Sequence, residues 1–125
     1  GPEPDPETTQ TFEGTEVLYI PDNAPAGVSG EIQVPDSLAI ASLSLELNVS
    51  HTYVGDLRIS LSHGGIEAVV WDRAGGSAQD IHQSFSLDDF DSTDAQGNWT
   101  LTVSDNAAQD VGTVDGWKLL VTPQQ

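Results

Sequence analysis

The sequence contains no cysteine and very few basic residues. Without cysteine, the chain can form neither a disulfide framework nor a zinc site built on thiolates. Three basic side chains, Arg58, Arg73 and Lys118, stand against 20 acidic ones, so the formal net charge is −17. Such a chain cannot neutralise a row of phosphates, which excludes nucleic acids and anionic membrane surfaces as partners.

Methionine is also absent, and no apolar run approaches the roughly 18 residues of a membrane-spanning helix. Since even the first residue is not methionine, we expect the chain to begin inside a longer gene product, with Gly1-Pro2 as a scar of tag cleavage. Residues 1–11 hold three prolines, three acids and no large apolar side chain. This composition predicts a linker or tag remnant, extended or disordered, ahead of a single domain over residues 12–125.

What the sequence does contain is a regular alternation of apolar and polar residues. Apolar side chains recur at every second position over 43–49, which puts them on one face of a β-strand. The segments 57–61, 99–103 and 117–121 repeat this pattern, and shorter β-like runs lie at 15–20, 31–34, 68–71 and 84–87. No window of more than about ten residues has a helical period with capping residues. We therefore predict about eight strands and no helix.

Strands with one apolar face bury that face against a second sheet. The predicted fold class is therefore all-β, an antiparallel two-sheet β-sandwich of jelly-roll type. Trp71, Trp99 and Trp117 lie in phase with apolar neighbours, so core packing is favoured over a flat platform for a sugar ring. Tyr53, between two predicted strands, is the aromatic residue that we expect to be most exposed.

No set of residues in the sequence has the pattern of a known catalytic site. The Gly-x-Ser-x-Gly elbow of serine hydrolases and the His-Glu-x-x-His motif of zinc proteases are both absent. His51, His63 and His82 lie in predicted loops or strand ends, where a surface or hydrogen-bonded histidine is the usual outcome. We therefore predict no catalytic residue and expect that the chain is not itself an enzyme.

Several motifs resemble the P domain (Homo B domain) of proprotein convertases, in the branch found in secreted bacterial proteases. The motifs are HTYVGDLRISL at 51–61, GNWTLTVSDNAAQDVGT at 97–113, GWKL at 116–119, IPDN at 20–23 and RAGGSAQDI at 73–81. Together they extend over about residues 15–122, in the order found in the family. The chain departs from the family after Ser62, where His63-Gly64-Gly65 forms a shorter hairpin than the usual Ser-Pro-x-Gly-Thr turn.

The resemblance implies a jelly roll of the galactose-binding-like type, which agrees with the alternation of apolar residues. It also implies a non-catalytic domain that packs on the catalytic domain of the same polypeptide, stabilises it and in some enzymes contacts the protein substrate. The catalytic domain would be of the subtilisin-like serine type or a metalloprotease, with the serine type favoured. We accordingly expect a secreted bacterial protein, and a monomer when the domain is isolated.

Loops rich in aspartate are the best candidates for a binding site. Hard cations such as Ca²⁺ take six to eight oxygen ligands, which loops supply better than strands. Suppose that the first strand, which ends at Ile20, pairs with the last strand, which starts near Trp117. The aspartates in the turn after Ile20 then meet those in the loop between 105 and 116 at one edge of the sheet. This reasoning predicts a structural calcium ion as cofactor, with Asp22, Asp56, Asp105, Asp110 and Asp115 as metal ligands.

A second candidate metal site is the segment 72–80, with Asp72 and Asp80 as ligands. The alternative for all these acids is a solvated acidic surface, in which loop aspartates serve as turn formers. The alternative for the whole domain is a carbohydrate-binding jelly-roll module, which would need an exposed aromatic platform.

Overall fold

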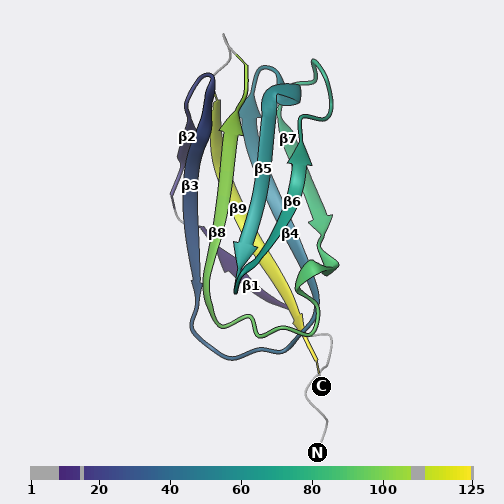
Figure 1. Ribbon diagram of the computed structural model, residues 1–125. Helices are drawn as coiled ribbons and strands as arrows, with labels where there is room; N and C mark the ends of the chain where they lie inside the picture. The colour runs from purple at the N-terminus through teal and green to yellow at the C-terminus, as the bar shows by residue number, and fades with distance from the viewer. Residues whose placement is uncertain (1–8, 15, 108–111, 125) are drawn as a thin grey trace, which may run out of the picture.

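The structure is a computed structural model that describes residues 9–14, 16–107 and 112–124, and it confirms the predicted two-sheet sandwich (Figure 1). The first sheet has five strands and the second has four, with antiparallel pairing throughout. Strands of the first sheet lie in the order β1 (Gln10–Glu13), β9 (Gly112–Pro123), β4 (Ile40–His51), β7 (Ile81–Ser86), with β2 (Leu18–Ile20) also paired to β9. The second sheet has the order β3 (Ala24–Val34), β8 (Gly97–Asp105), β5 (Leu57–His63), β6 (Ile66–Asp72).

The only helical segments among the described residues are two short 3₁₀ turns, η1 (Val54–Asp56) and η2 (Asp88–Phe90). Neither has the length or the apolar character needed to cross a lipid bilayer, and no other helix lies in the described part of the chain. The prediction of a chain without long helices is therefore confirmed.

The core lies between the two sheets and is built from the predicted alternating rows. Inward residues of the central strands β4, β5, β8 and β9 are almost completely buried. Trp99 is 0% exposed and Trp117 is 2% exposed, which confirms both as core residues, while Trp71 is partly buried against the core. Buried ring faces offer a sugar no stacking surface, so these two tryptophans give no support to the carbohydrate-binding alternative.

The supposed pairing of the segment that ends at Ile20 with the last strand is present, but the strand bounds differ: β2 is shorter than the expected run 15–20, and β9 begins before Trp117. β2 pairs with residues 112–114 of β9, and β1 pairs with 118–121 of the same strand. β1 includes Gln10 and Thr11, the last two residues of the predicted linker, since their backbone groups pair with β9. Tyr19, on the outward side of β2, is 75% exposed and Tyr53 only 39%, so the prediction that Tyr53 is the most exposed aromatic is wrong. In an edge strand whose Leu18 and Ile20 face the core, the residue between them points to solvent.

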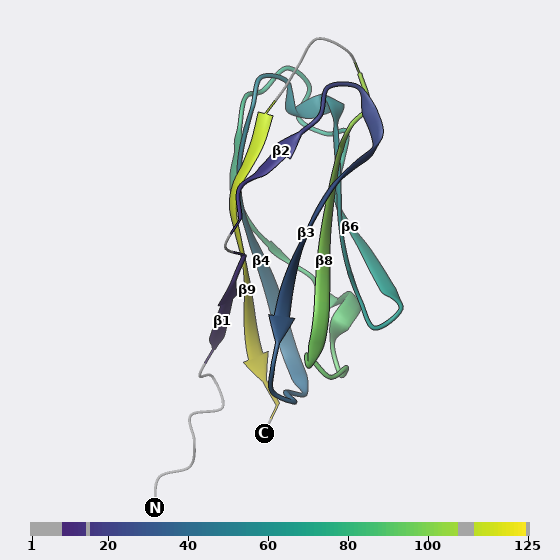
Figure 2. The same ribbon diagram turned by 90° about the vertical axis from the view of Figure 1, so that its left-hand side faces the viewer.

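The loops gather at the two opposite ends of the sandwich (Figures 1 and 2). We call one end the His51 pole: it comprises loops 21–23, 52–56, 73–80 and 106–107 with the adjoining strand ends. The other end, the His63 pole, comprises loops 35–39, 64–65 and 87–96 and both ends of the described chain. Asp22, Asp56, Asp80 and Asp105 therefore all lie at the His51 pole, although they are far apart in the sequence.

Candidate functional site

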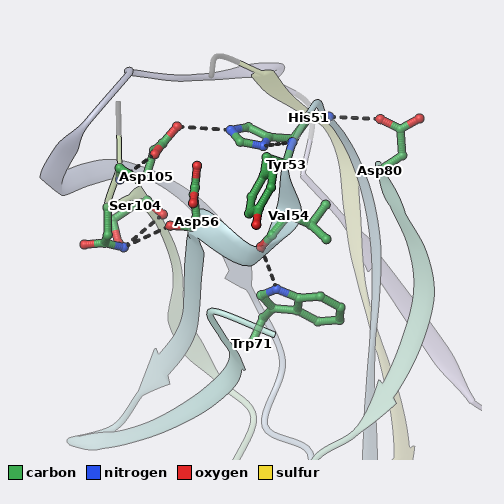
Figure 3. A network of polar contacts seen from close by, with 10 residues as sticks. His51, Tyr53, Val54, Asp56, Trp71, Asp80, Ser104 and Asp105 are labelled. Atoms are coloured by element: carbon green, nitrogen blue, oxygen red, sulfur yellow. Dashed lines mark hydrogen bonds and ion pairs between the residues drawn. The ribbon is translucent and has the colours of Figure 1, made fainter. Parts of the chain in front are cut away.

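A buried histidine–aspartate pair joins the two sheets at the His51 pole (Figure 3). His51 ends β4 of the first sheet and Asp105 ends β8 of the second, and His51 Nε2 lies 3.1 Å from Asp105 Oδ2 with both side chains 0% exposed. His51 Nδ1 accepts the backbone N–H of Tyr53 at 3.1 Å. Because Nδ1 accepts, the ring hydrogen is on Nε2, which donates to Asp105. The remaining carboxylate oxygen, Asp105 Oδ1, accepts the backbone N–H of Ala107 at 3.0 Å.

The loops of this pole are attached to the same pair. Asp80 Oδ1 accepts the backbone N–H of His51 at 2.9 Å, and the backbone N–H of Asp80 donates to the His51 carbonyl at 3.0 Å. The 3₁₀ turn η1 is joined to the 73–80 loop by the bond from the N–H of Val54 to the Ala78 carbonyl at 3.0 Å. Trp71 supports η1 from below, because its indole N–H donates to the Val54 carbonyl at 3.0 Å. The pole is thus a connected network rather than a set of separate loops.

Asp56 is the third acidic side chain of this network. It is 6% exposed, and its carboxylate lies between Asp105 and Tyr53 and points toward the His51 ring (Figure 3). The Asp56 carbonyl accepts the backbone N–H of Asn106 at 2.9 Å, which ties η1 to the end of β8. His51, Asp56 and Asp105 therefore form a buried polar cluster where the two sheets meet.

Asp115 lies on the outer face of the first sheet, away from this cluster. Its carboxylate accepts the hydroxyl of Ser50 and, at 2.6 Å, the hydroxyl of Thr113. These two donors, the Ser50 hydroxyl first, lower the pKa of Asp115 below its ordinary value of 3.8. A bulge opposite Asn48 and Val49 shifts the register of β9, so that Val114 faces the core and Asp115 faces out.

The other predicted metal ligands lie around the cluster. Asp22 is exposed in the turn before β3, and Asp72 is exposed in β6 with its carboxylate 4.0 Å from Arg58 Nε. Asp110 lies outside the described residues. Within the described part of the chain, no three histidine, cysteine or acidic side chains are arranged to hold a metal ion. The carboxylates of Asp80, Asp105 and Asp115 accept hydrogen bonds from the protein itself. The set of metal ligands stays a prediction.

The sequence does indicate which polar residues are buried: they stand two positions after the last apolar residue of an inward-facing row. His51 follows Leu47 and Val49 at the same two-residue interval, and Asp105 follows Leu101 and Val103 in the same way. Each continues an inward-facing row past the last apolar residue, and both are buried. A polar residue at an inward position is therefore the signal that sequence reasoning could have used.

His63 obeys the same rule at the opposite pole, since it follows Ile59 and Leu61. Its ring stacks on the Trp99 indole with a centroid distance of 3.9 Å and an interplanar angle of 3°. Nδ1 lies 2.8 Å from the carbonyl oxygen of Asn98, and Nε2 lies 2.8 Å from that of Asp94. Carbonyl oxygens only accept hydrogen bonds, so a His63 ring that makes both bonds carries hydrogens on both nitrogens and a positive charge.

Asp94 organises the loop that receives His63. Its carboxylate accepts the backbone N–H groups of Gln96 at 2.9 Å and Leu38 at 3.0 Å and the Ser37 hydroxyl at 2.7 Å. The Gln96 bond is the largest of the effects that lower the pKa of Asp94 below its ordinary value of 3.8, and the positive charge of His63 contributes in the same direction. The two poles are therefore both held by a histidine and an aspartate, in different arrangements.

Comparison with known proteins identifies the family to which this architecture belongs. The family model described as the proprotein convertase P-domain matches residues 40–121, more than half of the chain. The chain is 38% identical over 113 residues to Leupeptin-inactivating enzyme 1 of Streptomyces exfoliatus, covering 88% of this chain and 26% of that protein. It is 34% identical over 110 residues to the Transglutaminase-activating metalloprotease of Streptomyces mobaraensis, covering 86% of this chain and 14% of that protein.

Among solved structures, the crystal structure of the Aeromonas sobria serine protease in complex with the chaperone ORF2 shares the fold. The TM-score is 0.74 with 18% sequence identity, over 94% of this chain and 26% of that one. The chain thus spans about a quarter or less of the relatives to which it is similar. The matched family model and the two Streptomyces relatives lead to one conclusion: this chain belongs to the proprotein convertase P-domain family.

Proposed function

We propose that this chain is a non-catalytic accessory domain of a larger secreted bacterial protease and stabilises the catalytic domain of that polypeptide. The observation that carries the proposal is the coverage: nearly all of this chain matches between 14% and 26% of proteins named as an inactivating enzyme and a metalloprotease. Most of each relative therefore lies outside the matched region. The relatives include a metalloprotease and the fold neighbour is a serine protease, so the proposal covers either type of catalytic domain.

The test compares the complete gene product with a version from which residues 12–125 are deleted. If the domain stabilises its neighbour, the deleted version loses protease activity at a lower temperature, while the purified domain alone does not cleave casein. Equal thermal inactivation of the two versions would contradict the stabilising role. Inhibitors of the usual contaminating proteases are added as a control. Casein cleavage by the purified domain that persists in their presence would contradict the non-catalytic role.

We also propose that calcium stabilises the whole domain by binding at the His51 pole. Two relatives are named calcium-dependent proteases; one, from Nostoc, is 30% identical over 119 residues and covers 87% of this chain and 18% of that protein. Asp22 and Asp56 lie at this pole, and the predicted ligand Asp110 belongs to the same β8–β9 connection as Asn106 and Ala107. Carboxylates supplied by loops are the ligands that Ca²⁺ prefers.

Melting in 5 mM Ca²⁺ and in EGTA tests this second proposal. With a dissociation constant of about 10⁻⁴–10⁻³ M, typical of extracellular modules, calcium would stabilise the fold by about 1–2 kcal/mol and raise Tm by several degrees. Asp110→Asn should reduce the difference between the two conditions, and Asp89→Asn, exposed in η2 at the opposite pole, should leave it unchanged. Equal melting of the original chain in both solutions would reject calcium binding without affecting the accessory-domain proposal.

A further inference from the structure

Figure 2 shows the side of the sandwich where β1 and β2 face β3. A hollow of about 340 Å³ lies among residues of these strands, their connection and β9. It is bounded by Gly14 and Glu16 from the β1–β2 connection, by Ser29 and Glu31 from β3, and by Trp117 of β9. A volume of this size is at the small end of the range for ligand-binding pockets. The two walls come from different sheets, so the hollow is a feature of the sandwich rather than of one loop.

Trp117 contributes an indole N–H without an acceptor. The indole N–H of Trp71 donates to the Val54 carbonyl at 3.0 Å and that of Trp99 to the Ala95 carbonyl at 2.8 Å. The side chain of Trp117 is almost fully buried, yet its Nε1 makes no hydrogen bond within the part of the chain that the structure describes. Among the described residues no buried side-chain nitrogen or oxygen lacks a partner, so this Nε1 is not itself buried but is an open donor beside the hollow.

Gly14 shows that this Nε1 edge is the side of the indole that borders the hollow. A Cβ atom on Gly14 would lie 2.5 Å from Trp117 Nε1, so only glycine allows the backbone to pass this close. The backbone N–H of Gly14 donates to the Trp117 carbonyl at 2.9 Å and holds the connection in place. Both residues line the hollow, so the Nε1 edge of the indole and Gly14 lie side by side at its border.

Two glutamates border the same hollow, and neither has a cationic neighbour. Glu13 on β1 is 3.4 Å from Lys118, whereas Glu16 and Glu31 make no ion pair or hydrogen bond among the described residues. The chain as a whole carries a formal charge of −17. Two unpaired carboxylates on a concave surface of such a chain attract cations.

We propose that this hollow binds a lysine or arginine side chain of a protein partner. The cationic group lies between Glu16 and Glu31, and a carbonyl or hydroxyl oxygen of the same partner accepts the indole N–H of Trp117. Ammonium and guanidinium groups both donate to carboxylates, and the planar guanidinium donates to two at once. This proposal does not rest on the accessory role proposed above, since it concerns only groups present in this chain.

Other ligand classes fit the same groups less well. An anion would be repelled by the two glutamates. A bare metal ion gains nothing from an indole N–H, which is only a donor. A sugar would need an exposed ring face for stacking, and Trp117 is buried.

The three indole N–H groups make a direct NMR test possible. The chain, labelled with ¹⁵N and with its resonances assigned, is titrated with N-acetyl-arginine amide, which carries both a guanidinium and carbonyl oxygens. The Trp117 indole resonance should shift with saturation, and those of Trp71 and Trp99, whose N–H groups already donate to carbonyls, should stay in place. N-acetyl-glutamine amide, which lacks the charge, should cause at least a tenfold smaller shift at the same concentration.

Glu31→Gln is the main test variant and Glu67→Gln is its matched control. Glu31 and Glu67 lie on the opposite edge strands of the second sheet, in one cross-strand row with Thr100 and Ser62. Each substitution removes one negative charge, so general attraction to an acidic surface changes equally. We expect Glu31→Gln to weaken binding of the arginine amide at least fivefold and Glu67→Gln to leave it within twofold.

Several outcomes would overturn the proposal. A Trp117 resonance that does not move with the arginine amide would show that the hollow is not a cation site. Equal weakening by Glu31→Gln and Glu67→Gln would mean that only surface charge is involved. An equal response to the glutamine amide would exclude the cationic group, and a saturable shift of Trp117 with cellobiose alone would make the hollow a sugar site.

Discussion

The two poles of the sandwich hold a histidine at equivalent positions with different hydrogen-bond partners. His51 and His63 each continue an inward-facing row by one polar residue at a strand end. At the His51 pole the ring accepts from the Tyr53 N–H and lies 3.1 Å from the Asp105 carboxylate, while at the other pole both ring nitrogens of His63 lie 2.8 Å from carbonyl oxygens. The difference teaches that the groups facing the ring, and not its place in the row, determine the hydrogens that it needs in order to bond with both partners.

The largest effect is expected for His51→Ala. This change leaves the Asp105 carboxyl group buried between the sheets with the Ala107 N–H as its donor. Removal of one partner of a buried pair costs about 3–5 kcal/mol. Because a domain of this size has a total stability of about 5–15 kcal/mol, the variant should be close to unfolding. The measurement is the urea-unfolding free energy.

Two further variants make this result specific to the pair. Arg58→Ala removes the exposed ion pair with Asp72 and should cost less than about 1 kcal/mol. The double variant His51→Ala/Asp105→Ala should be less destabilised than the sum of the two single variants, because no buried carboxyl group is left behind. Additive costs would show that the two residues act independently.

A smaller loss is expected for His63→Ala at the other pole. The variant loses the stack on Trp99 and two hydrogen bonds to backbone carbonyls, together about 2–3 kcal/mol. His82→Ala, at an exposed position in β7, is the control and should change the unfolding free energy by less than about 0.5 kcal/mol. If His63→Ala lowers the unfolding free energy more than His51→Ala does, the expectation that the His51 pole contributes more to stability is wrong.

The hydrogens on the rings can be observed directly. In ¹⁵N-edited NMR of the folded chain, His63 should show hydrogens on both ring nitrogens and His51 only on Nε2. Two hydrogens on His51 would mean that the Tyr53 N–H is not bonded to Nδ1. One hydrogen on His63 would mean that one of its two carbonyl contacts is not a hydrogen bond.

The smallest effect is expected for the loss of folding stability at acidic pH. The pKa values of Asp94 and Asp115 are lowered in the folded state by backbone N–H and hydroxyl donors, so both groups favour the fold in their ionised form. The stability that they contribute is present above their ordinary value of 3.8 and is lost as the pH falls below about 4. Urea midpoints measured at pH 6, 4 and 3 should fall below pH 4, and less steeply in the double variant Asp94→Asn/Asp115→Asn.

His63 affects the acid response of the pole at which it lies. The charge of His63 is one of the causes that lower the pKa of Asp94, so His63→Gln should bring that pKa slightly closer to its ordinary value. The pKa of Asp115, on the outer face of the other sheet, should not change. NMR titration of the two carboxyl groups separates these outcomes, and an equal change at both would point to a general rearrangement instead.

The fold could be predicted because apolar residues at every second position indicate which side chains face the core. The rows ending in Val49, Leu61 and Val103 are all buried. β1 could not be predicted in the same way, because Gln10 and Thr11 become a strand only through pairing with β9. Such tertiary pairing outweighs the weak intrinsic preference of polar residues for strands.

The candidate site could be predicted only in its location. Acidic loops that are remote in the sequence do meet at one pole, but sequence spacing could not show that Asp115 turns outward at a bulge in β9. Nor could it show that Asp105 is hydrogen-bonded to His51. Both facts depend on register and burial, which a two-residue period does not specify.

The pairing of Gln10 with Val121 has a geometric consequence for any larger polypeptide. The described chain enters and leaves the sandwich through neighbouring strands of one sheet, at the His63 pole (Figure 1). Sequence joined to either end would therefore connect at that pole, and the aspartate-rich loops would project from the far tip of the domain. A neighbouring domain would therefore meet the His63 pole first, with the length of the strands between it and the acidic loops.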